Sequence, residues 1–546
     1  MMKKADWDKA RQYTPEMLAT AREVLFEVMD GVEVMKSIRS KPLKAGGYIA
    51  KHTLVTVYRQ MVEDGELEED PALLASIRMK PTRTLSGVTT VTVLTRPHPC
   101  PGHCVFCPDE DDMPKSYLPD EPGAARAVQN EFDPFRQVSS RLQAYEAVGH
   151  PTDKIELLIL GGSWTAYDRE YQEWFVWRCF DAMNGRETES LEQAHIVNET
   201  AEHRNVGLVV ETRPDEITPE VIAWMRWLGV TKVQMGAQSL DNEILERNLR
   251  GHTKEDTLQA CALLRAAGFK IVLHWMPNLL GSDLQSDRED FTRLWAPEEG
   301  GLGYSPDEIK IYPTQLLENA ELYKYWQCGE YQPYSSEELI EMIADLKPTI
   351  PEYCRVNRVI RDIPSTHVVA GNKRTSLRQD VFKELEQRGE ICRCVRCREV
   401  RGEKINPDTL QMQDKVYHPA YAEEHFISYV TPEDKLAGYL RLSLPGEFPK
   451  DNESKGDPLS NLTDLSGAAL IREVHVYGQS LEVGTEQAGA AQHIGLGTSL
   501  LQEAERIAAK AGFKRMAVIA AIGTRLYYAG RGFEMGELYM VKDVRV

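Results

Sequence analysis

Three cysteines fall within one short stretch, Cys100-Pro-Gly-His-Cys104-Val-Phe-Cys107. Electron-transfer iron–sulfur clusters are normally held by four cysteines, and this C-x3-C-x2-C run supplies three. A four-iron cluster held in this way keeps one iron open for another ligand, which is what a catalytic cluster needs. The alternative is a structural zinc site whose fourth ligand is His98 or His103.

A second group of cysteines follows much later, in Cys392-Arg-Cys394-Val-Arg-Cys397. This spacing predicts a zinc site with a fourth ligand from elsewhere, for which Cys354 and His418 are candidates. Buried cysteines without a metal are the alternative. The chain has ten cysteines in all, and six of them in two tight groups suggest metal ligation in a reducing cytoplasm rather than disulfides.

Polar and glycine residues follow several apolar runs that we predict to be strands. Gly161-Gly162 comes directly after one run, where glycines let a ligand approach the backbone. Glu211 and Gln238 follow the next two runs. At a barrel mouth such side chains can bind ribose hydroxyls and an α-carboxylate.

The C-terminal region contains a glycine-rich turn, Gln492-His-Ile-Gly495-Leu-Gly497-Thr498, which opens a predicted helix. Backbone N–H groups at such a turn form an anion site suited to a pyrophosphate. The turn follows a predicted strand at Arg472–Val476 and precedes Tyr527-Tyr528. A plain helix start is the alternative interpretation.

These residues require a scaffold, and strand-like runs alternate with amphipathic segments from about residue 76. The predicted strands are Val88–Leu94, Ile155–Leu160, Val206–Val210, Lys232–Met235, Ile271–Trp275 and Glu308–Ile311. One long helix is predicted over Arg126–Val148. This alternation predicts an α/β fold with a partial or closed (β/α) barrel, whose chemistry lies at the C-terminal ends of the strands.

We divide the chain into a helical, basic region (1–75), the barrel (76–369), a small metal-binding linker (370–425) and an α+β domain (426–546). The net charge is −20, yet two stretches are basic. Their residues are Lys36, Arg39, Lys41, Lys44, Lys51 and Arg59, then Arg355, Arg358, Arg361, Lys373, Arg374 and Arg378. Such patches fit phosphate binding or ordinary solvated faces. No apolar run is long enough for a membrane span, and the N-terminus has no signal pattern, so we expect a cytoplasmic protein.

The first cysteine run and the glycines resemble those of radical S-adenosylmethionine enzymes. The glycine turn and the tyrosines resemble those of GNAT acetyltransferases. Together they resemble the catalytic subunit of the Elongator complex, in the single-chain form of bacteria and archaea. This resemblance covers nearly the whole chain and includes Lys80-Pro-Thr-Arg83, Arg250-Gly-His-Thr253 and Lys310-Ile-Tyr-Pro-Thr314.

The resemblance implies an acyltransferase that carboxymethylates carbon 5 of the wobble uridine of tRNA. Cys100, Cys104 and Cys107 would hold a [4Fe-4S] cluster, and Gly161, Gly162, Glu211 and Gln238 would bind S-adenosylmethionine. A deoxyadenosyl radical would take hydrogen from the acetyl methyl group of acetyl-CoA. The resulting carbon radical would add to uracil, and hydrolysis of the thioester would follow.

The resemblance also implies a binding site for acetyl-CoA, with Tyr528 and Lys154 as catalytic residues. Its members would be Glu473, Val474, His475, Val476, Gln492, Gly495, Leu496, Gly497, Thr498, Tyr527 and Tyr528. The implied partners are the anticodon stem-loop of tRNA and an electron donor, and the chain would act as a monomer or homodimer. The main alternative is a protein (histone) lysine acetyltransferase with a structural cluster. A non-catalytic RNA-binding scaffold is a further alternative.

Overall fold

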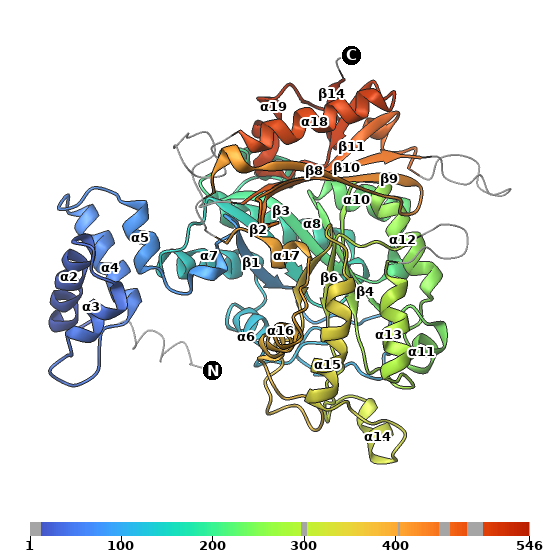
Figure 1. Ribbon diagram of the computed structural model, residues 1–546, viewed down its shortest axis with the longest axis horizontal. Coiled ribbons are helices and arrows are strands. Elements are labelled where there is room, and N and C mark those ends of the chain that lie inside the picture. Colours follow the sequence, from blue (N-terminus) through green and yellow to red (C-terminus); the bar gives the residue numbers. More distant parts are fainter. Residues whose placement is uncertain (1–12, 296–302, 402–404, 447–458, 478–494, 545–546) are drawn as a thin grey trace.

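The computed structural model describes residues 13–295, 303–401, 405–446, 459–477 and 495–544. Two seven-stranded sheets form the body, and a group of N-terminal helices stands to one side of it (Figure 1). The second sheet, orange to red in Figure 1, lies across one end of the first. No helix in the described ranges is long and apolar enough to cross a membrane.

The first sheet is entirely parallel and follows the chain in its order β1 to β7. Its strands are β1 (Thr89–Leu94), β2 (Lys154–Leu160), β3 (Arg204–Thr212), β4 (Lys232–Gln238), β5 (Lys270–Trp275), β6 (Glu308–Ile311) and β7 (Arg355–Arg358). Within the described residues β1 and β7 do not pair with each other, so the sheet is a partial barrel with two edges. The partial barrel expected from the sequence is confirmed.

Helices connect the parallel strands and cover the outer face of the sheet (Figure 1). The helices between β1 and β7 are α6 (Pro122–Gln129), α7 (Pro134–Glu146), α8 (Arg169–Asn184), α9 (Leu191–Asn198), α10 (Pro219–Trp227), α11 (Asn242–Arg247), α12 (Lys254–Ala266), α13 (Leu284–Arg293), α14 (Leu322–Gln327) and α15 (Ser336–Leu346). Two more, α16 (Leu377–Arg388) and α17 (Val395–Arg398), follow β7. Several begin with a side-chain cap; at α12, Thr253 and Asp256 form a reciprocal capping box. Such caps fix where each helix begins after the preceding loop.

The N-terminal helices form a small core of their own. They are α2 (Pro15–Met29), α3 (Val34–Ser40), α4 (Lys51–Glu63) and α5 (Pro71–Ile77). Leu25, Leu54 and Ile77 are fully buried among them. This core is separate from the large hydrophobic cluster that joins the two sheets.

The second sheet has the order β13-β14-β12-β11-β10-β9-β8 and is antiparallel except for the pair β11 and β12. Its strands are β8 (Gln411–Tyr417), β9 (Ala422–Val430), β10 (Leu436–Pro445), β11 (Ala468–Val476), β12 (Arg515–Val518), β13 (Glu534–Met535) and β14 (Met540–Asp543). Helix α18 (Leu496–Lys510) connects the two parallel strands, and α19 (Arg525–Ala529) follows β12. An α+β unit of this kind is consistent with a GNAT fold.

A buried ionic cluster holds the two sheets together. Arg472 on β11 donates to Asp307, just before β6, and its Nη1 lies 2.8 Å from the Glu424 carboxylate. Arg441 Nη1 lies 3.3 Å from Asp307 Oδ1. Burial raises the pKa of Asp307, but Arg472 and Arg441 outweigh it and bring the pKa to about 2. Because removing one partner would leave a buried charge unpaired, the cluster fixes how the sheets sit together.

Several features differ from the sequence-based expectations. The helix predicted over Arg126–Val148 is two helices, because the chain turns through left-handed φ angles at Glu131 and Phe132 before Pro134 starts α7. The strands β7 and β8 were not anticipated. Both consist mainly of polar residues, so they lack the apolar pattern that marks the other strands.

Candidate active site

A single cavity of about 1670 Å³ extends through the partial barrel to the second sheet. It joins residues that the sequence analysis assigned to two separate ligands. Those that line it are Cys100, Cys104, Cys107, Lys154, Gly162, Glu211, Gln238, Glu473, Val474, His475, Val476, Gly495, Gly497, Thr498, Tyr527 and Tyr528. Gly161 and Leu496 lie behind the wall, and Gln492 is outside the described residues.

The first cysteine run lies in the loop after β1, at the C-terminal ends of the parallel strands. Arg250 Nη1 donates to Cys104 Sγ at 3.4 Å, and Arg250 Nη2 donates to the Gly236 carbonyl at 2.6 Å. A Cβ atom at Gly102 would lie 2.3 Å from Arg213 Nη1. The loop therefore needs a glycine where it passes over Arg213.

The surroundings of this run fit a ligand larger than one ion. Arg213 Nη1, Arg250 Nε and Gln238 Oε1 are buried and have no hydrogen-bond partner within the described part of the chain. Buried polar atoms normally have partners, so such a concentration marks a place for a bound polar group. His98 makes no hydrogen bond with a cysteine among the described residues. Its Nε2 lies 3.0 Å from the Ala166 carbonyl oxygen, and its ring stacks on Tyr167.

The glycine pair after β2 makes a close turn beneath this loop. Gly161 has φ +133°, and a Cβ atom there would lie 1.9 Å from Thr95 Oγ1. Gly162 has φ +95° and faces the cavity. Both positions exclude other residues, the first by contact and both by backbone conformation.

The Glu211 carboxylate is held at the end of β3. It accepts a hydrogen bond from the Tyr117 hydroxyl at 2.9 Å and lies 3.3 Å from His274 Nδ1. Burial lowers the pKa of His274 well below its usual value, and the charges of Lys310, Arg361 and Arg250 lower it further. The imidazole is therefore neutral.

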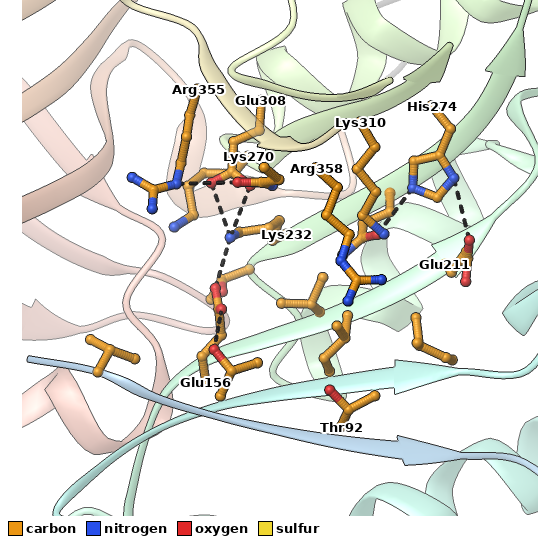
Figure 2. Close-up of a pocket in the computed structure, with 18 of the residues that line it drawn as sticks. Thr92, Glu156, Glu211, Lys232, Lys270, His274, Glu308, Lys310, Arg355 and Arg358 are labelled. Atoms are coloured by element: carbon orange, nitrogen blue, oxygen red, sulfur yellow. Dashed lines mark hydrogen bonds and ion pairs between the residues drawn. The ribbon is translucent and has the colours of Figure 1, made fainter. Parts of the chain in front are cut away.

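A layer of paired charges crosses the barrel lumen below these residues (Figure 2). Lys232 Nζ lies 2.7 Å from Glu156 Oε1 and 3.1 Å from Glu308 Oε1. Burial raises the pKa of Glu156, but Lys232 and Lys270 outweigh it and bring the pKa to about 2. Polar residues recur inside otherwise apolar strands at these positions, a signal that the sequence analysis did not use.

The other end of the cavity is formed by β11, α18 and α19. Glu473 accepts from Lys270 at 2.9 Å and from Arg441 at 3.0 Å, so this side chain joins the two sheets. A Cβ atom at Gly497 would lie 2.5 Å from the Tyr527 hydroxyl. Burial lowers the pKa of Lys154 and raises that of Tyr528. The rings of Tyr527 and Tyr528 pack edge to face at this end.

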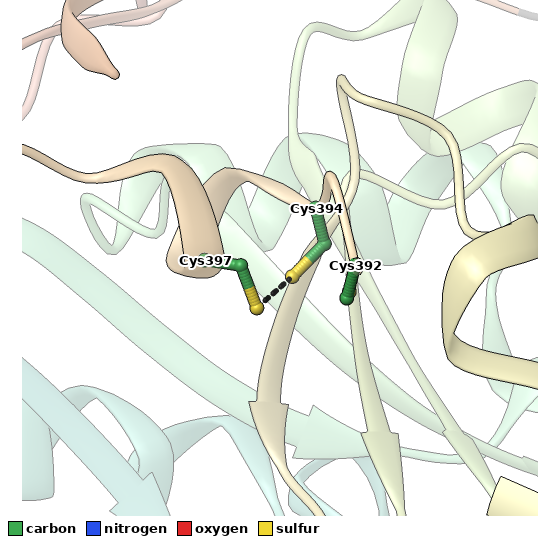
Figure 3. A group of neighbouring side chains, drawn as sticks. All are labelled: Cys392, Cys394 and Cys397. Carbon is green, nitrogen blue, oxygen red and sulfur yellow. Dashed lines mark hydrogen bonds between the residues drawn. The ribbon is translucent and has the colours of Figure 1, made fainter. Parts of the chain in front are cut away.

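The second cysteine group is compact. The ligand atoms of Cys392, Cys394 and Cys397 all lie within 4.8 Å of one another, and Cys394 Sγ is 3.5 Å from Cys397 Sγ (Figure 3). Sulfurs around one tetrahedral zinc ion would be about 3.8 Å apart, given Zn–S bonds of about 2.3 Å. Neither Cys354 nor His418 joins this group in the described structure.

The two basic stretches have different surroundings. Lys36 and Arg39 are exposed on α3, whereas Lys41 is paired with Glu23 and Glu27. In the second stretch carboxylates pair with four of the six cations, namely Arg355, Arg358, Arg361 and Arg374. At the rim of the cavity, burial and then Arg396 lower the pKa of Arg378 to about 10.

Comparisons with known proteins agree with this geometry. Residues 98–291 match the radical SAM superfamily, and residues 306–387 match the Radical_SAM C-terminal domain. The family match implies a [4Fe-4S] cluster and S-adenosylmethionine, which the three thiols and the unpartnered polar atoms fit.

Three similar proteins cover most of the chain. The tRNA uridine(34) acetyltransferase of Methanocaldococcus infernus is 40% identical over 87% of this chain and 89% of its own length. That of Dehalococcoides mccartyi is 40% identical over 85% and 99%, and human Elongator complex protein 3 is 32% identical over 97% of both chains.

A solved structure is also similar, that of the archaeal Methanocaldococcus infernus Elp3 with its N-terminus deleted. It has a TM-score of 0.71 and 37% identity, and the match covers 84% of this chain and 99% of that chain. On these matches, the chain belongs to the family of the tRNA uridine(34) acetyltransferases and Elongator complex protein 3, within the radical SAM superfamily.

Proposed function

We propose that the protein modifies carbon 5 of the wobble uridine of tRNA, using acetyl-CoA as the source of carbon and S-adenosylmethionine as the source of a radical. The single observation that carries this proposal is the continuous cavity of about 1670 Å³. One of its ends has three thiols and unpartnered polar atoms, and the other has the glycine turn and the tyrosines. The names of the relatives support the same substrate and acyl group.

At the barrel end, Cys100, Cys104 and Cys107 would hold the cluster through their thiolates. When bound, the cluster and S-adenosylmethionine supply one-electron chemistry that removes a hydrogen atom from carbon. Gly162 and Glu211 would bind the polar parts of S-adenosylmethionine, because the glycine leaves the backbone accessible and the carboxylate accepts from hydroxyl groups. Gln238 brings a buried Oε1 without a partner to the same place.

At the other end, Gly497 and Thr498 open α18 and leave backbone N–H groups for the pyrophosphate of acetyl-CoA. Val474 and Val476 would contact the pantetheine arm, since both face the cavity from β11. Tyr528 and Lys154 would approach the thioester. Burial lowers the pKa of Lys154, so its amine loses a proton more readily there than it would in water.

The ionic layer between the two ends would keep water away from the transferred group. Lys232 bridges Glu156 and Glu308, so these charges in the middle of the cavity are held in fixed positions. Fixed charges in a closed space need little reorganisation when the reaction proceeds. Exposed cations on α3 and arginines at the cavity rim would bind tRNA phosphates, and the compact cysteine group would bind zinc.

The test is anaerobic incubation of the reconstituted protein with tRNA, acetyl-CoA, S-adenosylmethionine and dithionite, followed by mass spectrometry of the digested nucleosides. We expect carboxymethyluridine that requires both small molecules. Acetyl-lysine on an added histone, with unmodified tRNA, would instead identify a protein acetyltransferase. Omitting S-adenosylmethionine is the matched control, because acetyl transfer to lysine does not need it.

A further inference from the structure

The lumen of the partial barrel contains lysines in two different electrostatic situations. Lys232 lies between Glu156 and Glu308, and Lys270 lies 2.9 Å from Glu473. Both cations are therefore compensated by carboxylates. Such pairing is the usual state of a buried lysine, since an isolated charge in a protein interior is unfavourable.

Lys310 on β6 differs from these two lysines. Its side chain is only 8% exposed and lines the cavity, yet no described carboxylate lies within 4.0 Å of its ammonium group. Its ammonium nitrogen lies 5.6 Å from the centroid of the Tyr312 ring. Figure 2 shows Lys310 and Arg358 extending together beside His274. The strand register places another cation, Arg358, opposite Lys310, and Arg358 is already paired with Asp362.

The strand register places Lys310 between the two ends of the cavity. It lies opposite His274 on β5 and opposite Arg358 on β7. His274 in turn contacts Glu211, which belongs to the barrel end. A group bound to the Lys310 ammonium would therefore lie next to the barrel end and above the ionic layer, where the two substrates would meet.

An ammonium group has three donors and no acceptor, and this restricts what it can recognise. Uracil presents a carbonyl oxygen, O4, at the position where cytosine presents an amino group. A base that leaves its stack is commonly read along this edge. An ammonium group that lines the cavity and has no carboxylate partner in the described structure would bind the uracil oxygen, whereas with cytosine it would face another donor.

We infer that Lys310 is the specificity-determining residue for the base: its ammonium group donates a hydrogen bond to O4 of the target uracil and rejects cytosine. This inference rests on the proposed function. It extends the proposed function by identifying the uracil atom that is recognised, O4, and the residue that recognises it, Lys310. Another possible partner for the same cation, the thioester carbonyl of acetyl-CoA, is distinguished by the experiment below.

The experiment compares two anticodon stem-loop RNAs that differ only in uridine or cytidine at the wobble position. Single-turnover modification of each is measured with wild-type protein, Lys310→Gln and Lys310→Arg, under anaerobic conditions. A glutamine carries an acceptor as well as donors, so we expect Lys310→Gln to reduce the uridine-to-cytidine rate ratio by about 10- to 100-fold. Lys310→Arg keeps donors only and should retain the wild-type preference.

Further readouts separate specificity from folding. RNA affinity should change less than about twofold in both variants, because phosphate contacts supply most of it. Iron content should stay at the wild-type level. Lys415→Gln, an exposed change on β8, is the matched control and should change neither ratio nor affinity.

The outcomes distinguish the inference from the proposed function. If wild-type protein modifies neither RNA, the proposed function fails, and the inference fails with it. If wild-type protein modifies uridine and Lys310→Gln keeps the full preference, only the inference is overturned. A raised KM for acetyl-CoA with an unchanged ratio overturns it as well, because Lys310 would then bind the thioester. If Lys310→Arg loses the preference for uridine over cytidine, the inference is also contradicted, because arginine, like lysine, offers only hydrogen-bond donors.

Discussion

The two groups of three cysteines look alike in sequence, but their sulfur atoms are spaced differently in the structure. Cys392, Cys394 and Cys397 have their sulfurs gathered within 4.8 Å, while Cys100, Cys104 and Cys107 form no such group in the described structure. Cys392 and Cys394 are buried and Cys397 lies within α17. The three cysteines of the other group line the large cavity. Three thiols converging on one point suit one ion, and three thiols set further apart suit a cluster of several metal atoms.

The surroundings of the two groups differ as well. A guanidinium group donates directly to Cys104 Sγ, and unpartnered polar atoms lie nearby. The compact group has its contacts among its own sulfurs and with the backbone around Cys354. The surroundings of Cys104 therefore suit binding of a further ligand, whereas the compact group of Cys392, Cys394 and Cys397 suits a structural role. Metal content and activity should therefore separate when each group is changed in turn.

The largest effect is expected for Cys104→Ser. With two thiolates left the cluster should be lost, and uridine modification should fall by more than about 10⁶-fold, toward the uncatalysed rate. Acetyl-CoA affinity, measured by calorimetry, should be unchanged, because that end of the cavity is formed by other elements. Elemental analysis should show loss of iron with zinc retained. Modification that survives in the iron-free variant would contradict a radical mechanism.

The next effect is expected for Cys397→Ser. Zinc should be lost and iron retained, with a loss of stability of about 2 kcal/mol, equivalent to roughly 4–8 °C in a unit of 150–250 residues. Thermal unfolding followed by calorimetry measures this shift. Part of the uridine-modifying activity should remain, since none of Cys392, Cys394 and Cys397 lines the large cavity. Unchanged zinc content would mean that the three cysteines are buried thiols without a metal.

Much of the scaffold could be predicted from the sequence because the strands β1 to β6 are apolar runs followed by glycine or polar residues. Strand β6 was predicted with its observed bounds. Strand β7, with the sequence Arg355-Val-Asn-Arg358, was missed because its polar residues face a charged lumen rather than a core. Local periodicity cannot reveal such a strand, because its partners come from distant parts of the chain.

The site could be predicted only in part. Cysteine spacing and glycine turns are local signals, so the residues of both cavity ends could be named from the sequence. The roles of Arg250 and Lys310 could not. Arg250 meets Cys104 through a loop 146 positions later, and Lys310 is unusual only because no carboxylate lies opposite it in the described strands. Both facts depend on tertiary packing and strand register.

The smallest effect is expected for Arg250→Met, which tests the electrostatic difference between the two cysteine groups. Reduction adds negative charge, so a nearby guanidinium stabilises the reduced state, and its removal should make the reduction potential more negative. A charge-assisted hydrogen bond worth about 1.5 kcal/mol corresponds to roughly 60 mV for one electron. Potentiometric titration followed by electron paramagnetic resonance measures the potential without any substrate turnover. Arg506→Met, an exposed change on α18, is the control and should leave the potential where it is. An unchanged potential in Arg250→Met would mean that this guanidinium only shapes the loop, and the comparison would then rest on sulfur geometry alone.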